Sequence, residues 1–367
     1  MKNTKNNMIC FVRRSTIDYD IRLKKYVKAC ELKKTPFIAI TWDRLKNSSP
    51  YNGDEYQFKV KAPYGGGLKS FIPLIGWAFF MYWNLIIHFK RYKTIHACNL
   101  EVFAMVFPFR IFGKKIVFDI YDSINPRIEK KLMKWADVLI LPNEKRLEQI
   151  GMSSKEIGDK LLVVENVPDL DYRITNFAED QQFSEKIKLS YVGTLERSIR
   201  GLETVVDIVK KDKRLYFDVA GVGSDMESFF EDCAQKCNRI KYHGQVKYEE
   251  GLSIMANSNF IIAIYRPSFP PYKYASPNKF HESLFLGKPV ITSSGTLVGD
   301  QVKKNNTGYL TIENEQEIDF ILKDAASDSF MNDYLAKVDN CKKLWNSTYK
   351  NYFTNIICGE YISKVLS

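Results

Sequence analysis

The residues with the sharpest chemical signal lie between Tyr274 and Ser294, in the sequence YASPNKFHESLFLGKPVITSS. Ser276 is a good helix N-cap, and Pro277 suits the first helical position, where its missing N–H costs nothing. Free backbone N–H groups at such a helix start attract anions, and Lys279 adds a positive charge. Glu282 follows three residues later on a neighbouring face. The pattern predicts a phosphate site beside a carboxylate that accepts hydrogen bonds from sugar hydroxyls, although a capped helix that leads into a core strand has the same spacing.

The elements that must position these residues follow from the hydrophobic pattern, in which short apolar runs alternate with helix-like segments. The runs predicted as strands are 8–12, 36–41, 94–98, 115–120, 138–142 and 161–165, then 187–192, 215–220, 240–244, 260–265 and 289–292, with 58–60 as a further candidate. Such alternation is typical of βαβ units and parallel sheets. The polar stretch 168–186 reads as a linker between the two series.

The predicted architecture is therefore α/β, with two Rossmann-like, doubly wound domains that face each other across a cleft. The first domain covers 1–170 together with a C-terminal helix at about 345–367, and the second covers 171–344. Ligands of such sheets bind at the carboxyl ends of the strands, and a cleft between two of them is the default site.

The charge of the chain is concentrated near its N-terminus. The 367 residues carry a net charge of +11, yet residues 1–100 alone hold 18 Lys and Arg against 6 Asp and Glu. The remainder is close to neutral, which argues against a uniformly basic nucleic-acid-binding protein and for one basic surface with a negatively charged partner. The seven cysteines are scattered, which favours a reducing compartment, and the four histidines lack metal-ligand spacing.

One apolar segment leaves three alternatives open. Residues 71–89 read FIPLIGWAFFMYWNLIIHF, with Lys69 before them and Lys90, Arg91 and Lys93 after them. The length fits a spanning helix. The central aromatic residues, Pro73 and Gly76 fit a buried helix better. The basic flanks also suit a helix that lies partly in the core and partly in an anionic membrane surface.

Several segments resemble glycosyltransferase family 4, whose members have the GT-B architecture. SPNKFHESLFLGKPVI resembles the nucleotide-binding helix of that family, and YVGTLERSIRGLETVV resembles the turn that opens its second domain. The family's Gly-x-Gly turn and the strand after it resemble DVAGVGSDMESF and IKYHGQVKYEE. The last helix and strand of its first domain resemble ADVLILPNEKRLEQI and KLLVVENVPD, and all of these segments agree with the family in order and spacing. The resemblance is strong over about 185–310, moderate over 90–170 and weak over 1–90.

The resemblance implies roles for individual residues of the second domain. Glu282 would hold the ribose of a nucleotide, and Lys279 with the amides around Asn278 would hold the diphosphate or the sugar. Arg200 would stabilise the leaving diphosphate, and Arg197 would share that task unless both are solvated loop charges. The remaining donor-binding candidates are Gly193, Thr194, Gly221, Ser276 and Pro277.

The chain departs from the family pattern at two places. Tyr274 stands where the family often has a Glu, so contacts from that Glu to the sugar are absent or replaced. In VFDIYDSI, Tyr121 and Asp122 take the places of a His-Glu pair, with Asp119 before them. Asp122 is a candidate catalytic residue, or else a helix cap.

Further candidates on the acceptor side are Arg13, Asp18, Arg22 and Tyr121, although Arg13, Asp18 and Arg22 also read as a solvated charge run. The Gly65–Gly67 run reads as a flexible loop.

The expected activity is retaining transfer of a sugar from a nucleotide-diphosphate sugar to a glycan or a polyisoprenoid-diphosphate-linked acceptor in surface-polysaccharide synthesis. No Asp-x-Asp triplet occurs where the donor is expected, so no metal is implied, and no cofactor beyond the donor is expected. The expected location is cytoplasmic, peripheral on the inner face of the plasma membrane, with an anionic membrane surface and no nucleic acid as partner. The alternatives are a GT-B-like sugar-nucleotide epimerase or phosphorylase, and a basic nucleic-acid-binding module.

Overall fold

The chain forms two compact units, Met1–Glu165 with Asn351–Ser367, and Asn166–Lys350. The sequence places the two boundaries at 170 and 344. The computed structural model describes residues 7–367 except 47, 63–70, 124, 170–185, 198, 224–225, 269, 312–316 and 326. The predicted Gly65–Gly67 loop and most of the predicted linker lie outside the described residues.

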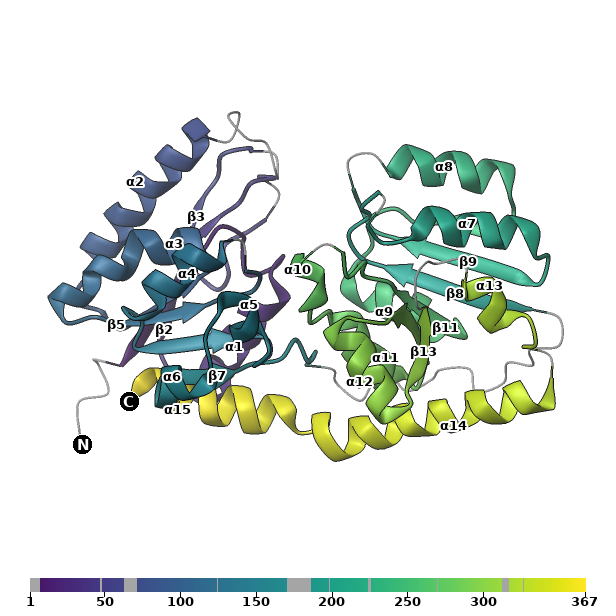
Figure 1. The fold of residues 1–367 in the computed structure, drawn as a ribbon. Coiled ribbons are helices and arrows are strands. Elements are labelled where there is room, and N and C mark those ends of the chain that lie inside the picture. Colours follow the sequence, from purple (N-terminus) through teal and green to yellow (C-terminus); the bar gives the residue numbers. More distant parts are fainter. Residues whose placement is uncertain are drawn as a thin grey trace. The chain divides into compact units, whose positions relative to one another are not determined.

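Each unit is built on a parallel sheet with helices on both faces (Figure 1). The strand order is β3-β2-β1-β4-β5-β6-β7 in the first sheet and β10-β9-β8-β11-β12-β13 in the second. In both, the chain winds outward from the first strand of the unit in one direction and then in the other, as in Rossmann-like folds. The predicted doubly wound α/β class is confirmed.

The strands of the first unit are β1 (Met8–Arg13), β2 (Phe37–Trp42), β3 (Glu55–Phe58), β4 (Tyr92–Cys98), β5 (Lys115–Asp119), β6 (Val138–Leu141) and β7 (Leu161–Val163). Its helices are α1 (Ile21–Leu32), α2 (Phe71–Ile87), α3 (Leu100–Val106), η3 (Phe107–Phe112), α4 (Pro126–Met133), α5 (Arg146–Ile150), α6 (Ser154–Ile157), η4 (Gly158–Lys160), η7 (Phe353–Tyr361) and α15 (Ile362–Leu366).

The strands of the second unit are β8 (Ile187–Val192), β9 (Leu215–Ala220), β10 (Ile240–Tyr242), β11 (Phe260–Ala263), β12 (Val290–Ser293) and β13 (Gly308–Thr311). Its helices are α7 (Leu202–Lys211), α8 (Glu227–Lys236), α9 (Tyr248–Ala256), α10 (Pro270–Lys273), α11 (Asn278–Leu286), α12 (Leu297–Asn305), α13 (Glu317–Leu322), α14 (Asp328–Leu344) and η6 (Trp345–Tyr349).

Both faces of the first sheet are buried because helices cover both. One face packs against α2 and α3, where Trp77 and Phe103 are fully buried. On the other face, Phe11 stacks on Tyr26 of α1, and Tyr26 stacks on Tyr361 of η7 with ring centroids 4.3 Å apart. The C-terminal segment thereby completes the first unit.

Local capping sets the starts of two helices. Helix α1 begins at Ile21 because the side chain of Asp20 accepts a hydrogen bond from the Leu23 amide, 2.9 Å away. Ser276 is not the N-cap of α11. Pro277 holds that position with an extended ψ of 143°, and Asn278 is the first helical residue. The helix ends at Leu286 because Gly287 adopts the left-handed conformation (φ 62°) that terminates helices.

Helix α2 packs one face on the sheet and leaves the opposite face exposed. In the part of the chain that the structure describes, no helix is long and apolar enough to cross a membrane.

Candidate functional site

Two loops at the carboxyl end of the second sheet touch through their backbones. The Gly193 amide donates to the Ala220 carbonyl at 3.0 Å, and the Leu195 amide donates to the Val222 carbonyl at 2.9 Å. A Cβ on Gly221, whose φ is 141°, would lie 1.8 Å from the Gly193 oxygen, so only glycine fits there. This contact sets the floor of a site beside the start of α11.

Lys279 reaches from α11 into this floor. Its ammonium donates to the Val192 carbonyl at 3.0 Å and lies 4.3 Å from the centroid of the Tyr191 ring. A Cβ on Gly193 would come within 2.7 Å of the Lys279 Nζ, so the absence of a side chain at Gly193 leaves the space that the ammonium uses. Burial, and next the charge of Arg200, lower the pKa of Lys279 to about 7.

Glu282 lies one turn further along α11 and is also buried. Its Oε1 accepts a hydrogen bond of 2.9 Å from the Tyr248 hydroxyl at the start of α9. Burial raises the pKa of Glu282, while the Tyr248 hydrogen bond and the Lys279 charge oppose the rise. The carboxylate is therefore held in place but little solvated, which suits a group that accepts hydrogen bonds from a ligand.

Arg200 is held by two aromatic rings and a carboxylate. Its guanidinium carbon lies 4.6 Å from the ring centroids of both Tyr265 and Tyr272. Its Nη2 pairs with Glu196 at 2.6 Å, and the Tyr272 hydroxyl donates to the same carboxylate. Among the described residues, its buried Nε and Nη1 have no hydrogen-bond partner. Two donors on a fixed cation are thus left for an anionic ligand.

The structure brings some of the predicted donor residues together and separates others. Gly193, Arg200, Lys279 and Glu282 surround the same floor. Arg197 is exposed and lies over the Phe229 ring of α8, 5.5 Å from its centroid. The Ser276 carbonyl accepts a hydrogen bond of 2.7 Å from the Asn166 side chain. Half-buried Pro277 and Asn278 open α11, and Thr194 is exposed on the loop after β8.

Four residues that sequence reasoning missed complete this cluster: Glu196, Tyr248, Tyr265 and Tyr272. Position is a signal for two of them, because Glu196 and Tyr265 follow strands β8 and β11 at the carboxyl edge of the sheet, where ligands of such folds bind. Nothing in the sequence indicates that Tyr248 would face Glu282.

In the first unit, Asp119 at the end of β5 is the centre of a buried network. Its two carboxylate oxygens accept from Nη2 and Nε of Arg22 at 2.8 and 3.1 Å, and Tyr26 donates at 2.9 Å. His96 lies 3.2 Å from the same carboxylate and 2.8 Å from the Tyr361 hydroxyl. Burial works to raise the pKa of Asp119, but the Arg22 charge and the His96 hydrogen bond overcome it and lower the pKa to about 2.

This network buries Arg22, so Arg22 does not belong to a solvated charge run, and its role on the acceptor side stays a prediction. Its Nη1 also donates to the Val164 carbonyl at 2.7 Å, and the side chain is almost completely buried. Arg13 likewise pairs with Asp20 at 2.5 Å and lies 4.3 Å from the Tyr121 ring centroid. Tyr121 is half-buried beside these pairs.

Two acidic acceptor-side candidates lie at the surface. Asp18 is exposed. The side chain of Asp122 is 79% exposed, and its Oδ1 lies 3.7 Å from Nη2 of the buried Arg146. Asp122 does not cap α4, since Asn125 does so through a hydrogen bond from the Ile128 amide. An exposed carboxylate beside a buried cation leaves the predicted catalytic role of Asp122 open to test.

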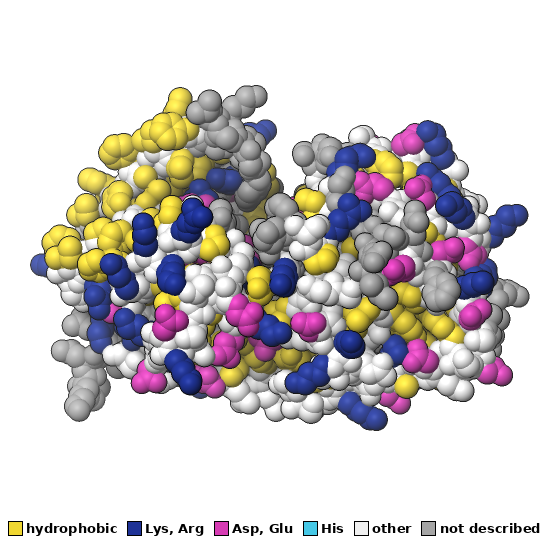
Figure 2. All heavy atoms as spheres, viewed as in Figure 1, with side chains coloured by type: hydrophobic (Ala, Val, Ile, Leu, Met, Phe, Trp, Pro, Cys, Tyr) yellow, Lys and Arg dark blue, Asp and Glu magenta, His cyan; other side chains and the backbone are white. Residues whose placement is uncertain are grey.

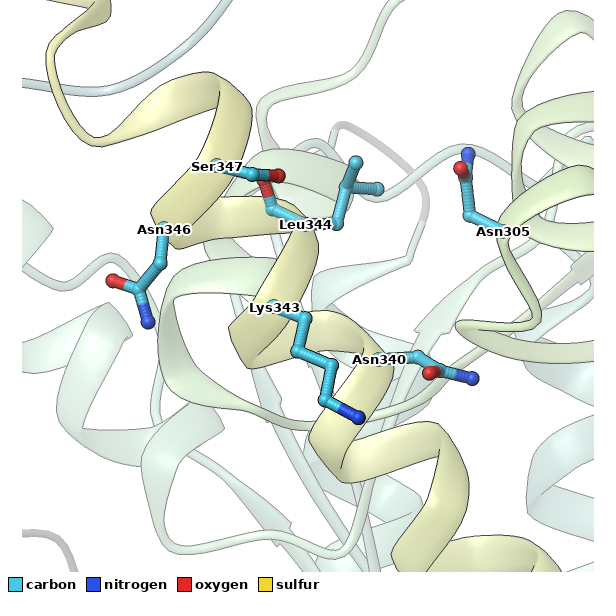
Figure 3. Close-up of a pocket in the computed structure, with 6 residues that line it drawn as sticks. All are labelled: Asn305, Asn340, Lys343, Leu344, Asn346 and Ser347. Atoms are coloured by element: carbon cyan, nitrogen blue, oxygen red, sulfur yellow. The ribbon is translucent and has the colours of Figure 1, made fainter.

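A separate hollow lies on the second unit between α12 and the junction of α14 with η6 (Figure 3). Its lining is Asn305, Asn340, Lys343, Leu344, Asn346 and Ser347. None of these residues belongs to the cluster around Lys279 and Arg200.

The comparisons with known proteins address the second unit most directly. Residues 186–323 match the family described as glycosyl transferases group 1. The second unit carries a group 1 glycosyltransferase domain. Every member of the cluster around Lys279 lies inside this group 1 domain, and the resemblance noted in the sequence is confirmed at this level.

Solved structures extend the likeness to the whole chain. Sucrose-phosphate synthase from Thermosynechococcus elongatus is 15% identical, with a TM-score of 0.71 over 97% of this chain and 96% of that one. HepE from Anabaena in complex with UDP and glucose is 14% identical, with a TM-score of 0.69 over 98% and 99%. WaaG, a glycosyltransferase involved in lipopolysaccharide biosynthesis, is 12% identical, with a TM-score of 0.62 over 97% and 99%. These likenesses confirm the GT-B fold. None of the curated protein sequences compared with the chain matches it.

Proposed function

We propose that this protein transfers a sugar from a nucleotide-diphosphate sugar, bound by the group 1 domain, to a glycan or polyisoprenoid-diphosphate-linked acceptor. The observation that carries the proposal is the cluster of Arg200, Lys279 and Glu282 at the carboxyl edge of the second sheet. The buried Lys279 and the largely buried Arg200 beside the buried Glu282 match the charge pattern of a nucleoside diphosphate, whose phosphates are anionic and whose ribose offers hydroxyl donors. The complex of HepE with UDP and glucose supports the same donor class.

In this proposal the residues act mainly by stabilising the leaving group. Departure of a nucleoside diphosphate concentrates negative charge on its β-phosphate. Three kinds of donor would stabilise that charge: the free N–H groups of Arg200, the Lys279 ammonium and the first amides of α11. They need no reorganisation, because the protein already holds them in place. Glu282 would accept hydrogen bonds from the ribose and orient the nucleotide.

The finer parts of the proposal rest on the family resemblance. They are retention of anomeric configuration, a hexose as the transferred sugar, and a role in surface-polysaccharide synthesis at the inner face of the plasma membrane. Independence of metal rests instead on the lack of an Asp-x-Asp triplet where the donor is expected in the sequence. Asp122 is the proposed acceptor-side catalytic group. The anomeric configuration of the product, determined by NMR and compared with that of the donor, tests retention.

The donor assignment is tested by titrating the full-length protein with a panel of UDP- and GDP-sugars in a calorimeter and by following hydrolysis or transfer of radiolabelled donors. Because hydrogen bonds to charged groups contribute about 1.5–3 kcal/mol, Glu282→Gln should weaken donor binding about tenfold to 100-fold. Glu250→Ala, at an exposed carboxylate of α9, is the matched control and should change binding less than about twofold.

Glu282→Gln keeps the size of the side chain, and thermal unfolding of both variants separates lost binding from lost folding. Absence of binding to every nucleotide sugar, or unchanged binding by a folded Glu282→Gln protein, would overturn the donor assignment. A product that is an isomeric nucleotide sugar would identify an epimerase instead.

A further inference from the structure

The outer face of α2 is apolar along its whole length. The inner face packs on the first sheet through Trp77, Met81 and Leu85. The opposite face carries Phe71, Ile72, Ile75, Phe79, Tyr82, Trp83, Ile86 and Ile87, which are between 36% and 79% exposed. A solvated helix face normally carries charged residues, whereas α2 contains none. Hydrophobic side chains gather over α2 in Figure 2.

The short helix η3 extends this surface. Ile111 and Phe112 are 83% and 68% exposed. The element is fixed beside the C-terminal half of α2, since the rings of Tyr82 and Phe109 stack with centroids 6.3 Å apart and the Tyr82 hydroxyl donates to the Met105 carbonyl at 2.9 Å. We call the eight exposed residues of α2 together with Ile111 and Phe112 the α2–η3 face. Because it is built from packed elements, it is a preformed apolar surface.

Cations border the α2–η3 face. Lys90 and Arg91 are exposed directly after α2. On the η3 side, Trp135 packs on Phe107, and the Lys134 ammonium lies 5.7 Å from the Trp135 ring centroid. Neither α2 nor η3 contains an acidic residue, and the nearby charge of Asp137 is paired with Arg110 at 2.9 Å. An apolar centre with a cationic border complements a surface that is apolar inside and anionic outside.

We propose that the α2–η3 face inserts into the surface of an anionic lipid bilayer, with α2 lying in the plane of the interface. Aromatic and branched apolar side chains beside Lys and Arg are the composition of helices that bind in this way. The 17 residues of α2 lie on a sheet through one face, which leaves the other for lipid.

Membrane binding through the α2–η3 face deepens the membrane part of the proposed function, and its biological purpose rests on that function. Lipid binding is nevertheless measurable without any sugar transfer. A failure to bind vesicles would leave donor binding untouched, and a failure to bind nucleotide sugars would leave the α2–η3 face intact. The two proposals can therefore fail separately.

The test is flotation of the full-length protein with vesicles of phosphatidylglycerol and phosphatidylethanolamine, compared with pure phosphatidylcholine vesicles. The wild type should float with the anionic vesicles. Phe79→Gln with Trp83→Gln should lower the partition coefficient at least about tenfold, since two rings lose their burial in lipid. Lys90→Gln with Arg91→Gln should lower it about fivefold for each cation on anionic vesicles and should change it little on neutral ones.

The matched control removes exposed apolar side chains elsewhere, with Leu32→Gln in α1 and Leu335→Gln in α14, and should float as the wild type does. Quenching of tryptophan fluorescence by brominated lipid should occur in the wild type and fall in Trp83→Phe. The proposal is refuted if the wild type does not float, or if Phe79→Gln with Trp83→Gln floats unchanged. It is equally refuted if the wild type is a dimer without lipid that this double variant converts to a monomer.

Discussion

Replacing Lys279 by arginine should change how donor binding depends on pH. Burial lowers the pKa of Lys279 to about 7, so part of its charge is missing from the free protein at neutral pH. A bound diphosphate would restore that charge and raise the pKa again. Binding therefore takes up a proton whenever the pH exceeds the pKa of the free protein, and affinity must fall as the pH rises above about 7.

The magnitude follows from linkage. If Lys279 has a pKa of about 7 in the free protein and regains the ordinary lysine value of about 10.4 in the complex, the affinity for a nucleotide sugar should drop about 25-fold between pH 6.5 and 8.5. Calorimetry at pH 8 in buffers of different ionisation enthalpy should record an uptake of about 0.9 proton per site. A nucleotide sugar is the right probe because its diphosphate has no further ionisation in this range.

Lys279→Arg isolates the effect because a guanidinium stays charged throughout this pH range. Its affinity should be nearly constant between pH 6.5 and 8.5, and Lys279→Met should be weak and equally constant. The other ionisable groups that act on Lys279 are Arg200, Glu282 and Glu196. A wild-type affinity that is constant with pH refutes the reasoning, and so does a slope that persists in Lys279→Arg but disappears in Glu282→Gln.

Two further predictions concern the other buried charges. Arg200→Met should lower donor affinity about 100-fold, because two charge-assisted hydrogen bonds are lost. Arg197→Met should change donor affinity less than about threefold, since Arg197 lies over Phe229. Calorimetry with the same donor compares the two variants, and equal losses of affinity would contradict the placement of Arg200 in the donor site and of Arg197 outside it. In the first unit, Asp119→Asn should lower the free energy of unfolding by about 3–5 kcal/mol because Arg22 stays buried without its counter-charge, and Tyr361→Phe should lower it by about 1–2 kcal/mol. Tyr51→Phe, whose exposed hydroxyl contacts Glu31, is the control, with an expected change below about 0.5 kcal/mol in urea titration. Since the pKa of Asp119 is lowered, its contribution to the free energy of unfolding is present above about pH 4 and should be lost as the pH falls toward 2. Asp119→Asn should remove this part of the pH dependence.

The sequence predicts the sheets well because strand formation here depends on local pattern. Runs such as Phe37–Trp42 are buried at every position and apolar except at Thr41, as expected for strands covered on both faces. The end of α11 is equally predictable, since Gly287 and Pro289 act within a few residues. Its start is harder to predict, because the residue types favour Ser276 as the N-cap and Pro277 as the first helical residue, whereas the helix begins one residue later with Pro277 as the N-cap.

The partners of charged residues are much less predictable. Arg13 ends strand β1, and Arg22 lies in the helix that follows it. The two look alike in the sequence, yet Arg22 pairs with Asp119, 97 residues away, and Arg13 with Asp20. His96 contacts Tyr361 across 265 residues. Such pairs depend on which strands are neighbours, and no local pattern encodes that. The outer face of α2 has the same difficulty, because composition does not reveal which side of an apolar helix is covered.

The two units use positive charge in opposite ways. The first holds most of the excess, but Arg13 and Arg22 are neutralised inside it by Asp20 and Asp119. Its excess positive charge therefore lies at the surface, where lysines and arginines such as Lys90 and Arg91 are exposed. These residues act through their summed electrostatic field.

The second unit is nearly neutral, yet it buries Lys279 and Arg200 close enough for Arg200 to lower the pKa of Lys279. Desolvating two like charges is costly, and the rings of Tyr265 and Tyr272 with the Glu196 carboxylate offset that cost only in part. An anion that enters the site would supply the missing counter-charge. The strength of the proposed donor site therefore comes from where two cations are placed and not from how many the domain contains.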